Sequence, residues 1–225
     1  MTVPDATLIL PALDEADVIE RVVSGLAGRA SEILVVDNGS TDGTGALAAR
    51  AGARVVREPQ RGFGAACWAG TVAARGDILC FLDADGTFAP NDVSRVIAEV
   101  EAGRVDVCLG TRTRTRQPAM RLDHRLVNLG LGAAVRLGGG PWLTDIGPLR
   151  AIHRQTLLDL GVADRGFAWP LEMVVRAAAA GLRIGELPVA YLPRLGGRSK
   201  VSGSLRGSLR AAHQMGGLLL REARR

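Results

Sequence analysis

Residues 78–85 read Ile-Leu-Cys-Phe-Leu-Asp-Ala-Asp, and this stretch decides the fold. Five apolar residues stand between Gly76-Asp77 and two carboxylates, a pattern that predicts a short buried strand. Asp83 and Asp85 then follow the carboxyl end of that strand, where open α/β sheets bind their ligands. Two carboxylates at i and i+2 suit a hard cation such as Mg²⁺ or Mn²⁺, which takes oxygen ligands. The same spacing also occurs in solvated turns, so the pair alone leaves both interpretations open.

Two other apolar stretches of the amino-terminal half also end in carboxylates. Residues 33–36 are Ile-Leu-Val-Val and are followed by Asp37, and residues 8–13 lead into Asp14-Glu15. A turn rich in glycine and serine follows Asp37, with Thr44 as the predicted cap of the next helix. Because parallel strands end at one edge of a sheet, these three segments predict one shared crevice.

Strands and helices alternate along this half of the chain. Apolar spacing predicts helices over 18–26, 44–51, 64–75 and from Pro90 to about Gly103, and strands over 54–57 and 105–110. This alternation is typical of an α/β fold, in which helices cover both faces of a mostly parallel central sheet to give a three-layer sandwich. No internal repeat or low-complexity linker interrupts it. We therefore expect one domain over residues 1–203.

Residues 204–225 have a different pattern. Their apolar side chains recur on one helical stripe and arginines flank it. A basic amphipathic helix of this kind lies on anionic membranes, although the stripe would equally serve to pack against the domain. The prediction is a carboxyl-terminal helix that contacts an anionic membrane surface.

The composition of the chain indicates where in the cell the protein is expected to lie. The chain has 225 residues, 47% of them hydrophobic, with a net charge of +5 and Lys200 as its only lysine. It contains no apolar stretch of the roughly 18–20 residues that a membrane span needs, and it begins without the basic region of a signal peptide. Its three cysteines have apolar neighbours and indicate reduced core thiols. We expect a cytoplasmic protein that is peripheral at the cytoplasmic face of the membrane.

The motifs together resemble the family 2 glycosyltransferases, which have the GT-A fold and bind a nucleotide-sugar. The matching pieces are the segment from Pro11 to Glu15, VVDNGSTDGT at 35–44, RGFGAA at 61–66 and DADGT at 83–87. The segments 144–152, 169–177 and 197–203 resemble motifs of the branch that contains the polyprenyl-phosphate (dolichol-phosphate) mannose synthases. The resemblance spans almost the whole chain.

This resemblance implies an inverting, metal-dependent transfer of a hexose from a UDP-, GDP- or dTDP-sugar to a polyprenyl monophosphate. A phosphate acceptor is already anionic near pH 7, since its second pKa is about 6, and it needs no strong general base. The catalytic residues would be Asp85, Arg112 and Lys200, and Asp83 and Asp85 would hold Mg²⁺ or Mn²⁺. Arg112, Arg125 and Ser199 would bind the acceptor phosphate. The donor would contact Pro11, Ala12, Glu15, Asp37, Gly62, Asp83 and Ala84.

Two positions depart from the family pattern. Asn38 stands where the family often has a second aspartate, and this removes one candidate contact to the base or ribose. Thr87 stands where mannose synthases have a glutamine that can complete the metal shell. A hydroxyl or a water could substitute there, because Mg²⁺ keeps several waters.

Other functions remain open at this point. A glycosyltransferase that acts on a small soluble hydroxyl acceptor would need a general base, with Asp145 or Glu172 as candidates. A nucleotidyltransferase would need a lysine near the first strand, which the chain lacks. A non-catalytic protein that binds nucleotides is the last alternative. Nucleic acid is disfavoured because only 4% of the residues are aromatic, which leaves few side chains for base stacking.

Overall fold

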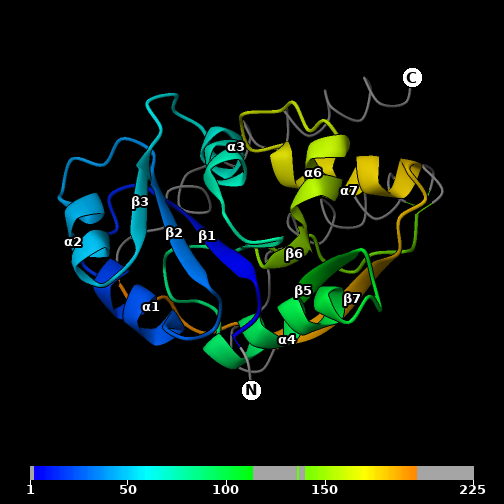
Figure 1. Cartoon of the computed structure of the whole chain (residues 1–225), viewed down its shortest axis with the longest axis horizontal. Coiled ribbons are helices and arrows are strands. Elements are labelled where there is room, and N and C mark those ends of the chain that lie inside the picture. The colour runs from blue at the N-terminus through cyan, green and yellow to red at the C-terminus, as the bar shows by residue number, and fades with distance from the viewer. Residues whose placement is uncertain (1–2, 114–135, 137–139, 197–225) are drawn as a thin grey trace.

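The computed structural model of the chain describes residues 3–113, 136 and 140–196 (Figure 1). Its centre is a seven-stranded sheet with the strand order β3-β2-β1-β4-β6-β5-β7. The strands are β1 (Ala6–Ala12), β2 (Glu32–Asp37), β3 (Arg54–Arg57), β4 (Ile78–Phe81), β5 (Val107–Thr113), β6 (Arg150–His153) and β7 (Ile184–Ala190). All neighbouring strands run parallel except β6, which is antiparallel to both β4 and β5. The predicted α/β fold with a mostly parallel central sheet is confirmed.

Helices cover both faces of this sheet, which confirms the three-layer sandwich (Figure 1). On one face lie α1 (Ile19–Leu26), α2 (Thr44–Arg50) and α4 (Pro90–Glu101), and their apolar side chains pack with Leu8 and Leu10 of β1. On the other face lie α3 (Phe63–Ala73), α6 (Arg154–Asp159) and α7 (Trp169–Ala179), which pack against Ile9, Leu34 and Phe81. Alternate residues of each central strand therefore feed two separate cores, as the two-residue period of a strand requires.

The sequence explains why the middle of the sheet is so apolar. Leu8, Ile9, Leu79 and Phe81 on neighbouring strands are each at most 1% exposed. Strands that are covered on both faces have continuous rather than alternating apolar residues. Pro188, in contrast, lies in β7 at the edge of the sheet, where a residue without an N–H costs no ladder hydrogen bond on the open side.

The elements differ from the expected ones at a few places. Thr44 is the first residue of α2 rather than its cap, and its N–H donates to Oδ1 of Asp42 at 3.0 Å. The antiparallel strand β6 and the short α6 were not predicted as separate elements. Their segment was assigned from its resemblance to a motif, and four residues that include a buried arginine have no clear strand period.

Parallel register places the three acidic segments together. Ala12 of β1 pairs with Asp37 of β2, and Ile9 of β1 pairs with Phe81 of β4. The ends of β1, β2 and β4 thus form one sheet edge that carries Glu15, Asp37 and Asp83. Among the described residues no helix is long and apolar enough to cross a membrane.

Candidate functional site

The two carboxylates of the turn after β4, Asp83 and Asp85, differ in burial and in hydrogen bonding. Asp85 is 3% exposed, and its Oδ1 accepts hydrogen bonds from the Thr87 hydroxyl at 2.7 Å and from the Thr87 N–H at 3.1 Å. Asp83 is half-buried, and Ala84 between them is buried. Thr87 therefore fixes one oxygen of Asp85, and the other oxygen, Oδ2, has a different partner.

The guanidinium of Arg194, from a segment distant in the sequence, lies beside Oδ2 of Asp85. Nη1 of Arg194 lies 3.1 Å from Oδ2 of Asp85, and Nη2 of the same guanidinium lies 3.2 Å from Oε1 of Glu15. Arg194 thereby joins the ends of β1 and β4, and sequence reasoning missed it. Arg194 precedes the segment 197–203, which contains the predicted phosphate ligand Ser199, and this position in the sequence was the one signal that could have found it.

The charge balance at this turn favours a cation. Burial and the neighbouring Asp85 raise the pKa of Asp83 to about 6, although Arg150, Arg194 and Arg112 act in the opposite direction. Two carboxylates this close repel each other when both are ionised, and a bound cation removes that repulsion.

The donor set fits the small hard cations that the sequence predicted. Mg²⁺ is commonly held by one or two carboxylates, with waters and substrate phosphates completing its shell. In the part of the chain that the structure describes, no cluster of three or more His, Cys, Asp or Glu side chains forms a complete protein cage. Two carboxylates that face a crevice match a metal that arrives with a phosphorylated ligand.

Arg150 lies behind the turn and was not predicted as a site residue. It is 1% exposed; its Nη1 donates to the Pro170 carbonyl at 3.1 Å, and its Nη2 donates to the Gly147 carbonyl. Burial lowers the pKa of Arg150 to about 10, so the guanidinium stays charged at neutral pH. Its positive charge acts on Asp83 from inside the protein.

The segment that carries Glu15 is fixed by the turn after β2. Asp14 has a φ of 46°, which is uncommon for a residue with a side chain, and its Oδ1 accepts from the Thr41 N–H at 2.8 Å. The Glu15 N–H donates to the Thr44 hydroxyl at 2.8 Å. These bonds hold the Glu15 backbone at the crevice between β1 and β2.

Asp37 closes the same crevice from β2. It is 8% exposed, and its Oδ1 accepts from the Ser40 N–H at 2.7 Å, which stabilises the turn. Pro11 and Ala12 lie beside it on β1, in register with Val36 and Asp37. The structure thus brings Pro11, Ala12, Glu15 and Asp37 together.

Asn38 has a structural role that the sequence did not reveal. Its Nδ2 donates to the carbonyls of Glu58 at 3.0 Å and Gln60 at 2.7 Å, and its Oδ1 accepts from the Gly62 N–H at 2.9 Å. Only an amide can donate and accept in this way, because an ionised carboxylate has no proton to give. Asn38 therefore ties the loop before α3 to the end of β2.

Packing explains the glycines of the RGFG segment. A Cβ on Gly62 would lie 2.2 Å from the Arg165 carbonyl oxygen, and one on Gly64 would lie 2.7 Å from that of Asp164. Gly62 also has a φ of 152°. The loop before α7 thus presses directly on the start of α3, and the predicted donor contact of Gly62 remains a prediction.

Arg112 at the end of β5 forms a two-point ion pair. Its Nε lies 2.7 Å from Oδ2 of Asp145, and its Nη2 lies 2.7 Å from Oδ1. This hydrogen bonding raises the pKa of Arg112 further above its ordinary value. The guanidinium also lies 5.4 Å from the ring centre of Tyr191. Asp145 is held in turn by its own N–H, which donates to Glu186 at 3.2 Å.

Glu172, the second candidate base, is buried in α7. It is 2% exposed, pairs with Arg176 at 2.7 Å and accepts the N–H groups of Ala163 and Asp164 at 3.1 and 2.6 Å. These contacts assign it to the support of the loop that packs on Gly62.

Three predicted site residues, Arg125, Ser199 and Lys200, lie outside the described residues, as does the predicted helix over 204–225.

Comparison with known proteins decides the family. Residues 7–161 match the model of Glycosyl transferase family 2. The chain is a family 2 glycosyltransferase. It is 43% identical over 203 residues to an uncharacterized glycosyltransferase of Mycobacterium tuberculosis H37Rv, covering 90% of this chain and 92% of the relative. It is 32% identical over 218 residues to the polyprenol monophosphomannose synthase of Mycolicibacterium smegmatis, covering 88% of this chain and 81% of the relative.

Solved structures support the fold of this glycosyltransferase. A crystal structure of glucosyl-3-phosphoglycerate synthase from Mycobacterium tuberculosis, in complex with Mn²⁺, UDP and phosphoglyceric acid, has a TM-score of 0.80 at 24% identity. The match covers 96% of this chain and 77% of that one. A crystal structure of a mycobacterial protein has a TM-score of 0.79 at 29% identity and covers 96% and 74% of the two chains. The GT-A fold is thereby confirmed, and the chain is a transferase.

Proposed function

We propose that this glycosyltransferase moves a hexose from a nucleotide-sugar to a polyprenyl monophosphate, with inversion at the anomeric carbon and with Mg²⁺ or Mn²⁺ bound. The proposal is supported by the acidic crevice at the carboxyl edge of the sheet and by the relative named polyprenol monophosphomannose synthase. One observation carries the choice of acceptor: both candidate general bases are engaged in ion pairs.

A hydroxyl acceptor needs a base that can take its proton in the transition state. Both oxygens of Asp145 accept from Arg112 at 2.7 Å, and Glu172 is buried against Arg176. A carboxylate whose oxygens already accept from an arginine is not directed at the hydroxyl of an acceptor. A phosphate acceptor avoids this requirement, since it carries its negative charge before it binds.

The roles of the residues follow from their positions. Arg112, oriented by Asp145, is proposed to bind the acceptor phosphate, together with Arg125 and Ser199. Asp83 and Oδ2 of Asp85 are proposed to hold the metal, which when bound supplies positive charge that stabilises the leaving diphosphate. Lys200 is proposed to add a second cation close to the phosphates, because its neighbours in the sequence are rich in glycine and serine.

The donor is proposed to lie along the ends of β1 and β2. Glu15 and Asp37 would hold the nucleoside, and Pro11, Ala12, Gly62 and Ala84 would line its path with backbone groups and small side chains. Catalysis would then consist of positioning two anionic substrates and stabilising the leaving group.

The polyprenyl acceptor would require access to a membrane surface. Residues 204–225 are proposed to supply it as a basic amphipathic helix that binds anionic lipid from the cytoplasmic side. Sedimentation with anionic vesicles would then fall as salt rises, and the absence of binding at low salt would contradict this part of the proposal.

The test is a transfer assay with purified full-length protein, Mn²⁺ and a panel of radiolabelled UDP-, GDP- and dTDP-sugars. Three acceptors are compared: a short polyprenyl phosphate, the corresponding polyprenol and 3-phosphoglycerate. The proposal predicts that label moves only to the polyprenyl phosphate and that the product has the opposite anomeric configuration to the donor. Transfer to 3-phosphoglycerate alone would establish a soluble phosphorylated acceptor, and retained configuration would contradict an inverting reaction.

A further inference from the structure

Arg194 is held over the acidic turn by its own backbone neighbours. The Leu192 N–H donates to the Thr87 carbonyl at 2.9 Å and the Leu195 N–H donates to the Asp85 carbonyl at 3.1 Å. The segment that follows β7 therefore lies along the turn after β4. This arrangement fixes the Cα of Arg194 beside Asp85 whatever its side chain contacts.

The side chain itself is held loosely. Within the part of the chain that the structure describes, each terminal nitrogen pairs with one carboxylate, Asp85 at 3.1 Å and Glu15 at 3.2 Å. Its Nε is buried and has no hydrogen-bond partner among the described residues. Arg112 offers a contrast, because two of its nitrogens contact both oxygens of Asp145 at 2.7 Å. A buried donor without a partner is unfavourable, so the guanidinium is less completely bonded here than that of Arg112. Another cation must take its place at Asp85 when it leaves, because a sheltered carboxylate needs a partner of opposite charge.

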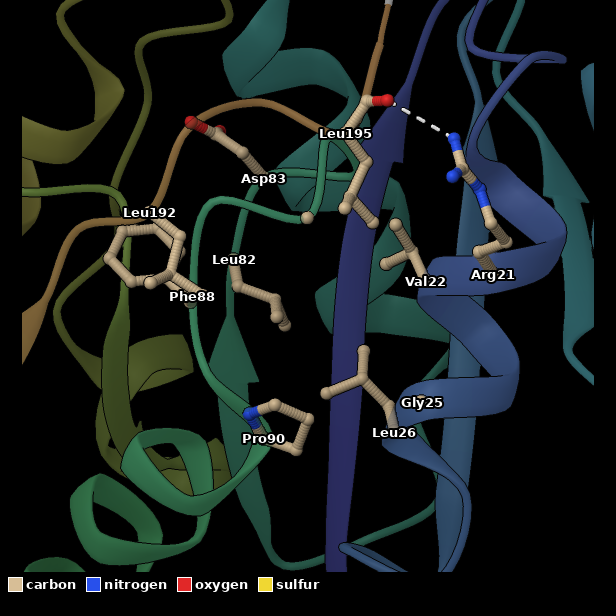
Figure 2. A pocket seen from close by; sticks show the side chains of 11 residues that line it. Arg21, Val22, Gly25, Leu26, Leu82, Asp83, Phe88, Pro90, Leu192 and Leu195 are labelled. Atoms are coloured by element: carbon tan, nitrogen blue, oxygen red, sulfur yellow. Dashed lines mark hydrogen bonds between the residues drawn. The ribbon is translucent and has the colours of Figure 1, made fainter.

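The segment that carries Arg194 also borders an apolar space. A cavity of about 190 Å³ lies between α1 and the turn after β4, lined mainly by apolar side chains that include Val22, Leu82 and Phe88. Leu195 points into it, and its carbonyl is tied to Arg21 by a hydrogen bond of 3.1 Å (Figure 2). Leu195 borders this cavity, lies against Gly86 and is 46% exposed.

We propose that Arg194 is an exchangeable counter-ion, which occupies the cation position at Oδ2 of Asp85 until the divalent metal displaces it. The inference rests on the proposed metal site and deepens it. The metal must compete with a resident positive charge, so it binds weakly alone. A nucleoside diphosphate strengthens its binding, because the diphosphate offers an anionic partner to the displaced guanidinium. Metal and donor therefore enter together, which keeps the carboxylates neutralised at every stage.

The test is calorimetric titration of the full chain with Mn²⁺, first alone and then with saturating UDP or GDP. The Arg194→Gln variant should bind Mn²⁺ alone on the order of tenfold more tightly than wild type, since the competing charge is gone. The gain in Mn²⁺ affinity on adding nucleotide should shrink in the same variant. Arg194→Lys retains a positive charge and should behave more like wild type than Arg194→Gln does.

Arg21→Gln is the matched control, because it loosens the same segment at Leu195 without changing the charge at Asp85. It should bind Mn²⁺ like wild type. Unchanged or weaker Mn²⁺ binding by Arg194→Gln, with binding still abolished by Asp85→Asn, would overturn the exchange while leaving the metal site intact. If neither wild type nor Arg194→Gln binds Mn²⁺ with or without nucleotide, the metal site itself is wrong.

Discussion

Arg112 and Asp145 form a two-point ion pair across the end of β5, with both N···O distances at 2.7 Å. The side chain of Asp145 is about 10% exposed and that of Arg112 about 30% exposed. The pair is thus sheltered on the carboxylate side and open on the guanidinium side. This difference in exposure suits an arginine, Arg112, that binds an anion, and a carboxylate, Asp145, that orients the arginine.

Replacing Asp145 by asparagine distinguishes two roles for this residue, that of orienting Arg112 and that of a general base. If Asp145 orients Arg112, kcat/KM should fall roughly tenfold to a hundredfold, the scale of a misplaced charge-stabilising donor, and the rate–pH profile should keep its shape. If Asp145 is a general base, the loss should reach about 10²–10⁴-fold and the acidic limb of the profile should vanish. Transfer rates measured from pH 5 to 9 distinguish these outcomes. Asp106→Asn is the matched control, because Asp106 pairs with Arg183 in a similar way at the other end of β5.

Asn38→Asp tests the contact between β2 and the loop before α3. An aspartate would place a carboxylate oxygen against the carbonyls of Glu58 and Gln60, which now accept from the amide. We expect the free energy of unfolding to fall by about 2 kcal/mol, the cost of leaving such buried groups unpaired. Nucleoside diphosphate affinity should fall as well, because the loop before α3 loses the two bonds that hold Glu58 and Gln60 to the end of β2.

Urea unfolding and titration with Mn²⁺ and UDP measure both effects. Asn91→Asp, an exposed position in the first turn of α4, should leave both quantities unchanged or slightly raise stability. Wild-type stability and nucleotide affinity in Asn38→Asp would show that this hydrogen-bonded contact has no effect on the site.

Glu32 gives a pH-dependent contribution to stability at the amino-terminal end of the sheet. Burial would raise the pKa of Glu32, but hydrogen bonds from Arg54 and Thr7 outweigh burial and hold the pKa below its ordinary value of 4.5. A depressed folded-state pKa means that this stabilisation is present above about pH 4.5 and is lost as the pH falls through the folded value.

Glu32→Gln should therefore lower the free energy of unfolding by about 1–2 kcal/mol at pH 7, and the difference from wild type should shrink below pH 4.5. Urea titrations at pH 7, 5, 4 and 3 check this trend. Glu101→Gln, at an exposed residue at the end of α4, should show no such trend. A constant difference across these pH values would rule out the ionised carboxylate as the cause.

The fold could be predicted from the sequence because β1, β2 and β4 are continuous apolar runs that end in carboxylates. The position of Glu15, Asp37 and Asp83 at one edge followed from parallel register. The role of Arg194 could not be predicted from the sequence, because it contacts Glu15 across 179 positions of the chain and no local pattern marks it. The sequence left open whether the Thr87 hydroxyl or a water completes the metal shell, and it did not reveal that this hydroxyl donates to Asp85. Hydrogen-bond partners depend on packing, and a sequence motif does not specify them.

The central claim is that Asp83 and Asp85 hold a divalent metal that meets the donor diphosphate. Crystals grown with Mn²⁺ and a nucleoside diphosphate, with diffraction recorded at the manganese absorption edge, test it most directly. We expect one anomalous peak within coordination distance of Asp85 and of a phosphate oxygen. Asp85→Asn crystals should lack the peak, while crystals of Asp77→Asn, an exposed aspartate at the other end of β4, should retain it. A peak away from both carboxylates, or none in crystals that contain bound nucleotide, would contradict the account.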